Sequence, residues 1–379
     1  MNDSPPPASV PDTRWSRIRR YYERHEQVVD LAAFVGGFVF DMAMLDRIDA
    51  WATIIQQAAY LVLIAAILLQ LFFAQDEAAQ PPAPAASRLA RRVREYRVPF
   101  VHFLLGTLLN LYTLFFFKSA SLFVSFGFML VLAALLAANE SKRAKARLGL
   151  TLKFALFSLC LLAFCAAIVP VFVGSIGLFV FLLSMLAACV PVAVMYRRIL
   201  IHAPQRGAQA RRQVLLPFGA VLAIFLGLYL FRLIPPVPLS IPFMGVYHDV
   251  VRAGDEYRLS HERPFWRVWD NGDQKFAAQP GDRIFVYFRI FSPARFADEV
   301  RVRWYWKDGQ GKWKPQDSIP IRITGGREEG FRGYGMKTNY QAGDWKVQVD
   351  TLDEREIGRI YFTVTPVPAG PRSFTVDVQ

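Results

Sequence analysis

Long apolar runs alternate with polar connections through the first 235 residues of the chain. Each run has about 18–22 residues, enough for a helix that rises about 1.5 Å per residue to cross the ~30 Å hydrocarbon layer of a bilayer. Continuous apolar runs also exclude the alternating pattern of barrel strands. The pattern therefore predicts seven transmembrane helices. They lie at Val28–Leu45, Ile54–Phe73, Val98–Phe117, Ser121–Ala138, Leu150–Val169, Val173–Val194 and Val214–Ile234.

Basic residues are concentrated in every second connection between these runs. Because cytoplasmic loops carry the excess of lysine and arginine, the N-terminus and these connections are expected in the cytoplasm. With seven crossings, everything after Ile234 is expected on the opposite side of the membrane. The basic residues on the cytoplasmic side are Arg14, Arg17, Arg19, Arg20, Arg24, Arg88, Arg91, Arg92, Arg94, Arg97, Lys142, Arg143, Lys145, Arg147, Arg197, Arg198, Arg206, Arg211 and Arg212.

After residue 242 the pattern changes to alternating apolar and polar positions, interrupted by turn residues. This pattern is typical of short antiparallel strands and predicts an all-β, immunoglobulin-like sandwich. The predicted strands are Phe265–Trp269, Arg283–Phe291, Glu299–Lys307, Ser318–Thr324, Phe331–Lys337, Trp345–Asp350 and Glu356–Thr365. The predicted domains are a basic arm (1–27), a seven-helix transmembrane domain (28–234), a proline-rich linker (235–242), an extracytoplasmic sandwich (243–366) and a tail (367–379).

The faces of the predicted strands differ in character. In Glu299–Lys307, Trp304 points to the apolar side, whereas Arg303 and Tyr305 point to the other side. Arg283–Phe291 is apolar on both sides, with Phe285 and Tyr287 on its outer face. Phe285, Tyr287, Arg303 and Tyr305 could together stack on a sugar or peptide. The alternative, which we favour, is that the outer face packs on a neighbouring loop, on the membrane domain or on an oligomer mate.

Charged and polar residues inside the apolar runs are the other candidates for a site. Asp41 lies near the outer end of the first run and Lys118 at the outer end of the third. Because an isolated charge in a membrane is costly, we hypothesise an ion pair between them. Asn110, deeper in the third run, is a candidate for a hydrogen bond between helices. In the alternative interpretation, Lys118 reaches the interface by itself and Asp41 is solvated locally.

Composition excludes several other classes. The formal charge of +13 lies mostly in the first 242 residues, where it follows the topology, so no nucleic-acid partner is expected. The three cysteines, Cys160, Cys165 and Cys189, all lie in predicted membrane helices and show no metal-binding spacing. The motifs H-E-x-x-H, G-x-S-x-G and the Walker A loop are absent from the sequence. We therefore expect no enzyme activity, no cofactor and no metal.

Short motifs along the chain resemble an uncharacterised family of bacterial inner-membrane proteins. They are FVGGFVFD (34–41), FFFKSASL (115–122), IPPVPLS (234–240) and YHDV (247–250), followed by VRVRWY (300–305), ITGGR (323–327), GFRGY (330–334) and GDWKV (343–347). The second group resembles a β-rich domain of unknown function. The resemblance implies a multi-pass protein of the inner membrane with a periplasmic β-domain, and it brings no established activity.

Three functions fit these expectations. The first is a membrane-anchored extracytoplasmic module that binds an envelope protein or a glycan. The second is a transporter of small solutes or lipids, although the runs show neither an internal repeat nor a broken helix with polar ligands at mid-membrane. The third is an intramembrane enzyme on lipid-linked substrates, with Asp41 and Lys118 as its only candidates. The lipid bilayer is the expected surrounding, and a homo-oligomer is compatible with all three.

Overall fold

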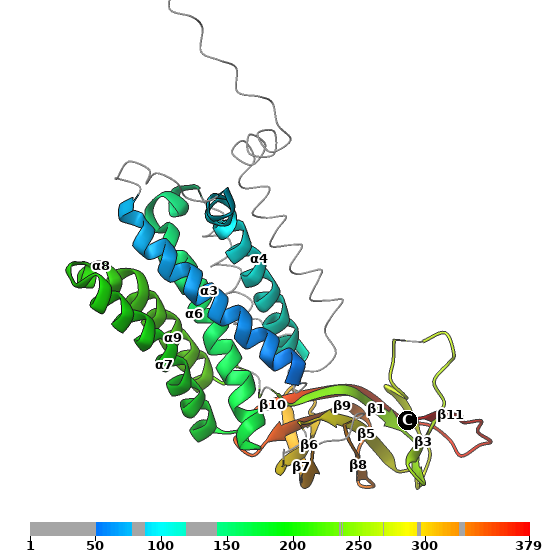
Figure 1. The fold of residues 1–379 in the computed structure, drawn as a ribbon. Coiled ribbons are helices and arrows are strands. Elements are labelled where there is room, and N and C mark those ends of the chain that lie inside the picture. The colour runs from blue at the N-terminus through cyan, green and yellow to red at the C-terminus, as the bar shows by residue number, and fades with distance from the viewer. Residues whose placement is uncertain are drawn as a thin grey trace, which may run out of the picture.

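The computed structural model describes residues 51–77, 88–118, 142–234, 236, 238–267, 269–293, 297–325 and 330–379. Within these ranges the chain forms a bundle of apolar helices followed by a β-rich domain at one end of the bundle (Figure 1). The predicted order of helices and then strands is therefore confirmed.

Four helical segments of the described residues are long and apolar enough to cross a membrane. They are Trp51–Gln75, Gly149–Val173, Leu178–His202 and Pro204–Leu230. The helices are α3 (Trp51–Glu77), α4 (Arg88–Lys118), α6 (Lys142–Val173), α7 (Leu178–His202), α8 (Gly207–Ala210) and α9 (Leu216–Leu230). A 3-10 turn η1 (Pro204–Arg206) precedes α8, and a π-helical turn η2 (Arg211–Leu215) joins α8 to α9. The described part of the chain thus has four such segments, compared with seven predicted. Helix α4 covers the third predicted run, and the first and fourth runs lie outside the described residues.

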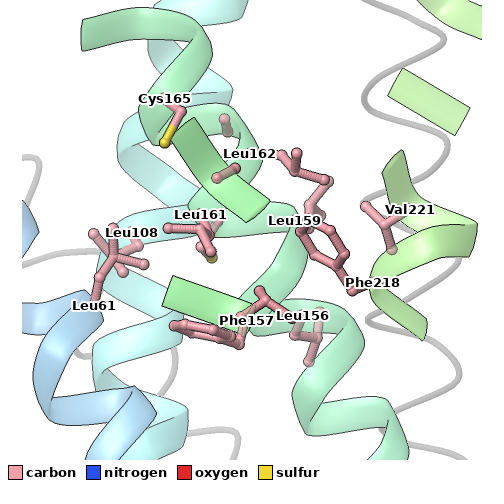
Figure 2. Close-up of a cluster of buried hydrophobic side chains, with 14 of the residues drawn as sticks. Leu61, Leu108, Leu156, Phe157, Leu159, Leu161, Leu162, Cys165, Phe218 and Val221 are labelled. Atoms are coloured by element: carbon pink, nitrogen blue, oxygen red, sulfur yellow. The ribbon is translucent and has the colours of Figure 1, made fainter. Parts of the chain in front are cut away.

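Helix α6 occupies the centre of the described bundle and contacts α3, α4, α7 and α9. Its apolar side chains, among them Leu159 and Leu162, are completely buried. Figure 2 shows them between Leu108 of α4 and Val221 of α9. The outer helices leave much of their apolar surface exposed, as is expected of helices that face lipid tails.

The connection before the last helix differs from the prediction. A polar loop was expected around Arg197–Arg212, but α7 continues to His202 and only Ala203 separates it from the next helical turn. Arg206 is buried, and its Nη1 donates to the carbonyl oxygen of Phe72 at 2.9 Å. This bond ties the connection between α7 and α9 to α3, and it satisfies one donor of a buried guanidinium.

The β-domain contains three antiparallel or mixed sheets. The strands are β1 (Ser240–Tyr247), β2 (Asp249–Ala253), β3 (Glu256–His261), β4 (Lys275–Ala278), β5 (Ile284–Phe291), β6 (Ala297–Lys307), β7 (Trp313–Thr324), β8 (Phe331–Lys337), β9 (Gly343–Thr351), β10 (Glu356–Pro366) and β11 (Thr375–Val378). Their orders are β4-β10-β9-β6-β7, β1-β5-β8 and β11-β3-β2. All pairs are antiparallel except β4 with β10.

The first two sheets pack face to face around one core. Trp304 and Val302 of β6, with Val347 of β9, pack against Val286 and Phe288 of β5, and all five are fully buried. The apolar side predicted for Trp304 in 299–307 is therefore confirmed as part of the inner face of a two-sheet sandwich, to which Val347 of β9 also contributes.

The third sheet covers the other face of β5. Tyr247, Phe285 and Tyr287 pack there against Val250 of β2 and Leu259 of β3. This explains why β5 is apolar on both sides: it is sandwiched between two layers, and a strand buried on both faces does not alternate. The interpretation favoured from the sequence, that this face is covered, agrees with the structure, but the cover is a third sheet and not a loop, the membrane domain or an oligomer mate.

Several predicted boundaries were wrong. Phe265–Trp269 does not form a strand, and its described residues belong to the connection between β3 and β4. The predicted linker at 235–242 overlaps β1, which tolerates Pro242 because it is an edge strand whose register shifts between Ser240 and Phe243. The predicted tail at 367–379 contributes β11, which pairs with β3.

Candidate functional site

The structure separates the four residues of the predicted binding face. Phe285 and Tyr287 are buried beneath the third sheet, so they cannot present an exposed surface. Arg303 and Tyr305 lie on the opposite sheet of the sandwich, on the outward face of β6. The predicted face therefore does not exist as one surface, and only its β6 half is accessible.

Strand register places Tyr305 in a row of side chains across the outward face of the five-stranded sheet. Tyr305 pairs with Lys346 of β9, which pairs with Tyr361 of β10. The Nζ atom of Lys346 lies 4.1 Å from the centroid of the Tyr305 ring and 5.6 Å from that of Trp313. Each ring thus presents its negative face to a cation.

This row leads into an open groove of about 610 Å³, which we call the aromatic groove. The groove lies between the segment that precedes β4 and the end of the five-stranded sheet where β6 turns into β7. It is lined by Trp266, Arg267, Trp269, Asp270, Gln274, Lys275, Lys307, Trp313, Asp344, Trp345, Tyr361, Phe362 and Thr363. Its volume lies in the range of small-molecule sites in proteins.

Two aromatic pairs line the aromatic groove, one from the segment before β4 and one from the five-stranded sheet. Trp266 and Trp269 are 6.1 Å apart between ring centroids, at an interplanar angle of 63°. Trp313 and Tyr361 are 5.7 Å apart, at 48°. Trp269 is 68% exposed and Tyr361 47% exposed, so both can contact a ligand.

The charged side chains of the aromatic groove are mostly tied to one another. Lys307 Nζ lies 3.6 Å from Asp344, whose other oxygen accepts a hydrogen bond of 2.9 Å from Thr363. Lys275 is exposed at the edge of the groove. Burial and the nearby guanidinium of Arg359 lower the pKa of Lys346. At the groove, Lys275 and Lys307 can donate hydrogen bonds and Asp344 can accept them, an arrangement typical of sites that orient polar ligands.

Of the three polar residues predicted to interact within the membrane helices, the structure describes the side chain of Asn110. Asn110 is buried in α4, within the helical core. Asp41 and the side chain of Lys118 lie outside the described residues, so their ion pair stays a prediction.

A second cluster of side chains joins the sandwich to the bundle. Arg355, in the turn between β9 and β10, is buried against the end of α9. Its Nη1 and Nη2 donate to the carbonyl oxygens of Ile234 at 3.2 Å and Tyr229 at 3.0 Å, and its Nε donates to Asp353 at 2.8 Å. Phe181 of α7 stacks on the Tyr229 ring at 3.8 Å. The cluster leaves only a small cavity of about 30 Å³, so its role is attachment.

A third cluster surrounds His248, between β1 and β2. Its Nε2 lies 3.5 Å from Asp273 and 3.6 Å from Glu262, and its ring stacks on Phe276 at 4.0 Å. Burial and the guanidinium of Arg372 lower the pKa of His248 to about 4, and burial raises the pKa of Asp273 to about 6. Among the described residues no group of three His, Cys, Asp or Glu side chains is arranged to hold a metal ion.

A protein-family model matches part of the sandwich, including several residues of the aromatic groove. A family model described as a protein of unknown function (DUF2914) matches residues 297–364, from β6 to β10. This segment carries Tyr305, Trp313 and Tyr361. The resemblance of the C-terminal motifs to a β-rich domain of unknown function is therefore confirmed for this part of the chain. No curated protein matches the chain.

The solved structures that resemble this chain do so with low sequence identity and low TM-scores. An immunoglobulin-like protein from Pseudomonas aeruginosa has 10% identity and a TM-score of 0.21, covering 34% of this chain and 98% of its own. A β-glucosidase from Kluyveromyces marxianus has 12% identity and a TM-score of 0.17, covering 35% and 16%. The alkylpurine DNA glycosylase AlkC from Pseudomonas fluorescens, bound to DNA, has 10% identity and a TM-score of 0.21, covering 84% and 99%. Such low scores carry no argument about fold or function.

Sequence reasoning identified Tyr305, which lies beside the groove, but missed the residues that line it. Trp266 and Trp269 were assigned to a strand, because PFWRVW is rich in aromatic residues, which favour strands. The signal against a strand was the surrounding density of charged and turn residues from Glu262 to Gly272. Trp313 lies just before the predicted strand 318–324, because β7 is longer than its apolar pattern suggests.

Proposed function

We propose that this chain is a membrane-attached binding protein whose sandwich holds a saccharide in the aromatic groove. The observation that supports the proposal is that two aromatic pairs, Trp266 with Trp269 and Trp313 with Tyr361, line a groove together with polar side chains. Sugar rings present apolar C–H faces that stack on aromatic rings, while their hydroxyls need hydrogen-bond partners at the edges. Lys275, Lys307 and Asp344 are placed to supply those partners.

The location of the binding domain is part of the same proposal. The sandwich is attached to the end of the bundle where α6 ends and α7 begins, and the basic residues Arg197, Arg198, Arg211 and Arg212 lie toward the opposite end (Figure 1). With the basic end in the cytoplasm, the sandwich lies outside it. In a bacterial inner membrane, the groove then faces the periplasm and its ligand is a component of the envelope.

The test is binding by the full chain in lipid nanodiscs to a panel of neutral and acidic oligosaccharides and to unrelated peptides. Wild type is compared with Trp313→Ala and Tyr361→Ala. Tyr334→Ala is the matched control, since Tyr334 is 43% exposed but lies on β8, in the other sheet. Loss of one stacking ring should weaken saccharide binding about tenfold, whereas the control should bind like wild type. If no oligosaccharide binds, if only peptides bind, or if all variants bind alike, the proposal is wrong.

A carrier of small solutes or lipids is the second candidate, and one observation favours it. Gln57 of α3 and His102 and Asn110 of α4 are almost completely buried inside the helical bundle. Polar side chains within membrane helices are costly and often belong to transport pathways. In this case, solute uptake into vesicles should require Gln57 or His102 and be insensitive to Trp313→Ala.

A further inference from the structure

The segment between β3 and β4, residues 262–274, carries the most exposed aromatic side chains of the β-domain; we call it the aromatic loop. Phe265 is 92% exposed, Trp269 68% and Trp266 53%. Phe265 is not part of the groove lining. Apolar surface of this size in water is unfavourable, and large exposed patches usually mark a contact with a partner or a membrane.

Hydrogen bonds hold the aromatic loop in a defined backbone conformation. The backbone N–H of Arg267 donates to Pro264 at 3.0 Å, and that of Asp270 donates to Arg267 at 3.2 Å, so two successive turns form its tip. Arg263 lies across the base and donates from Nη1 to the carbonyl oxygens of Arg267 and Asp270. These bonds hold the aromatic side chains outward.

Exposed aromatic residues also mark the end of the helical bundle nearest the sandwich. Trp51 begins α3, Phe172 lies at the end of α6, Phe179 lies at the start of α7 and Phe231 follows α9; these are the helix-end aromatics. Their exposures are 64%, 51%, 76% and 78%. Aromatic residues gather at the level where lipid tails meet headgroups. The helix-end aromatics therefore mark the membrane surface on the side of the sandwich.

The sandwich is oriented at this surface by several contacts. Arg355 is bonded to the end of α9, and the backbone N–H of Ala297 donates to Gly174, between α6 and α7, at 3.3 Å. In Figure 1 the aromatic loop, drawn yellow-green, extends from the sandwich toward the side on which the helices rise. The loop thus points toward the plane that the helix-end aromatics mark.

We infer that the aromatic loop inserts into the lipid interface of the same bilayer that the helices cross. Phe265 enters the region between headgroups and tails, while Trp269 lies at headgroup level beside the mouth of the aromatic groove. Arg263 and Arg267 stay bonded within the β-domain, to loop carbonyls and to Asp377 and Asp270. The sandwich is then held at two places, at Arg355 beside the helices and at the loop, and the aromatic groove opens at the membrane surface.

The test places a spin label at the tip of the loop in the full chain in nanodiscs. Phe265→Cys is made in a chain whose three native cysteines are replaced by alanine, and collisions with oxygen and with a water-soluble nickel complex are compared. Leu186→Cys is the lipid control, because Leu186 is 63% exposed in the middle of α7. Gly309→Cys is the water control, since a Cβ at Gly309 meets no atom within 4 Å.

The oxygen-to-nickel ratio at position 265 should lie between those of the two controls and clearly above that of the water control, because oxygen concentrates in the lipid tails and the polar nickel complex in water. A ratio like that of the water control, or protection from both reagents, would overturn the inference. A second measurement is made in the chain that keeps its native cysteines. Brominated lipids should quench the tryptophan fluorescence of wild type more than that of Trp269→Phe. Equal quenching would contradict insertion even if the cysteine-free chain failed to fold.

Discussion

The guanidinium carbon of Arg355 lies 3.4 Å from the centroid of the Tyr229 ring, and this contact joins a turn of the sandwich to the last helix of the bundle. The same guanidinium donates to the carbonyl oxygens of Tyr229, in the last turn of α9, and of Ile234, which follows the helix. A cation is also favoured there by the helix dipole. Together with the contact between Ala297 and Gly174, Arg355 thereby fixes the orientation of the β-domain relative to the membrane helices.

Replacing Arg355 by alanine should loosen this attachment. Its hydrogen bonds are charge-assisted and buried, so the loss should cost about 2–4 kcal/mol of stability. Thermal unfolding in nanodiscs should show a lower midpoint, and limited proteolysis should cleave the connection between α9 and β1 faster. Arg232→Ala is the control, because its pair with Glu354 at 2.8 Å is exposed to solvent on both sides. If both variants behave alike, Arg355 does not hold the two domains together.

Because the third sheet covers β5, alanine substitutions of Tyr287 and Tyr305 should differ greatly in their effect on the stability of the sandwich. Tyr287 is fully buried between two layers, whereas Tyr305 is partly exposed on the outward face. Tyr287→Ala should destabilise the sandwich by about 3–5 kcal/mol, as removal of a buried aromatic ring leaves a cavity. Tyr305→Ala should cost less than about 1 kcal/mol. Urea unfolding followed by tryptophan fluorescence measures both, and equal losses would mean that Tyr287 is not enclosed.

Two glycines with positive φ provide another matched comparison. Gly272 has φ +70° and Gly254 has φ +68°, so alanine is strained at both. A Cβ at Gly272 would lie 2.0 Å from the carbonyl oxygen of Val246, whereas at Gly254 no atom lies within 4 Å. Gly254→Ala should cost about 1–2 kcal/mol and Gly272→Ala clearly more. The difference in urea midpoint measures the clash, and its absence would show that Gly272 does not pack against β1.

The cluster around His248 should respond to acid with two opposing effects. The pKa of His248 is about 4 in the fold, below its ordinary value of 6.5, so its contribution to stability is lost as pH falls from 6.5 to 4. The pKa of Asp273 is about 6, above its ordinary value of 3.8, so its contribution grows as pH falls from 6 to 3.8. In wild type the two effects offset each other over most of this range.

Single substitutions should separate these effects. Asp273→Asn leaves only the histidine, so stability should fall more steeply than in wild type between pH 6.5 and 4. His248→Gln leaves only the carboxyl, so stability should rise relative to wild type over the same range. Urea unfolding at pH 4.5, 5.5 and 7, with Trp304 and Trp345 as buried reporters, gives the slopes. Parallel slopes in all three proteins would show that neither group is perturbed by the fold.

The sequence predicts the main architecture because its periodicity is strong. The continuous apolar run at 150–169 becomes the central part of the longer helix α6, which begins at Lys142, and the alternation at 299–307 becomes β6, which begins at Ala297. The third sheet was missed because β2, β3 and β11 are short and rich in charged residues. Only one side of each strand is covered, so their patterns resemble those of loops.

The groove was missed for a different reason. Its residues are distant in the sequence, and two strands separate β7 from β10, so the Trp313 side chain reaches Tyr361 only by lying across the face of the sheet. Phe285 and Tyr287 were included in the predicted face because they point away from the core of the sandwich and were therefore taken as exposed. In the structure both side chains belong to a second core, beneath the third sheet. Such double burial depends on which strands lie across the chain, and local pattern does not reveal that.

Hydrogen exchange of the full chain in nanodiscs, measured with and without the saccharide that binds best, tests the central claim directly. Binding in the aromatic groove should slow exchange in peptides that cover 305–316 and 343–347, where β6, β7 and β9 border the groove. Peptides from β8 should exchange as before. Protection within α3 or α4 instead would place the ligand inside the helical bundle and contradict the account.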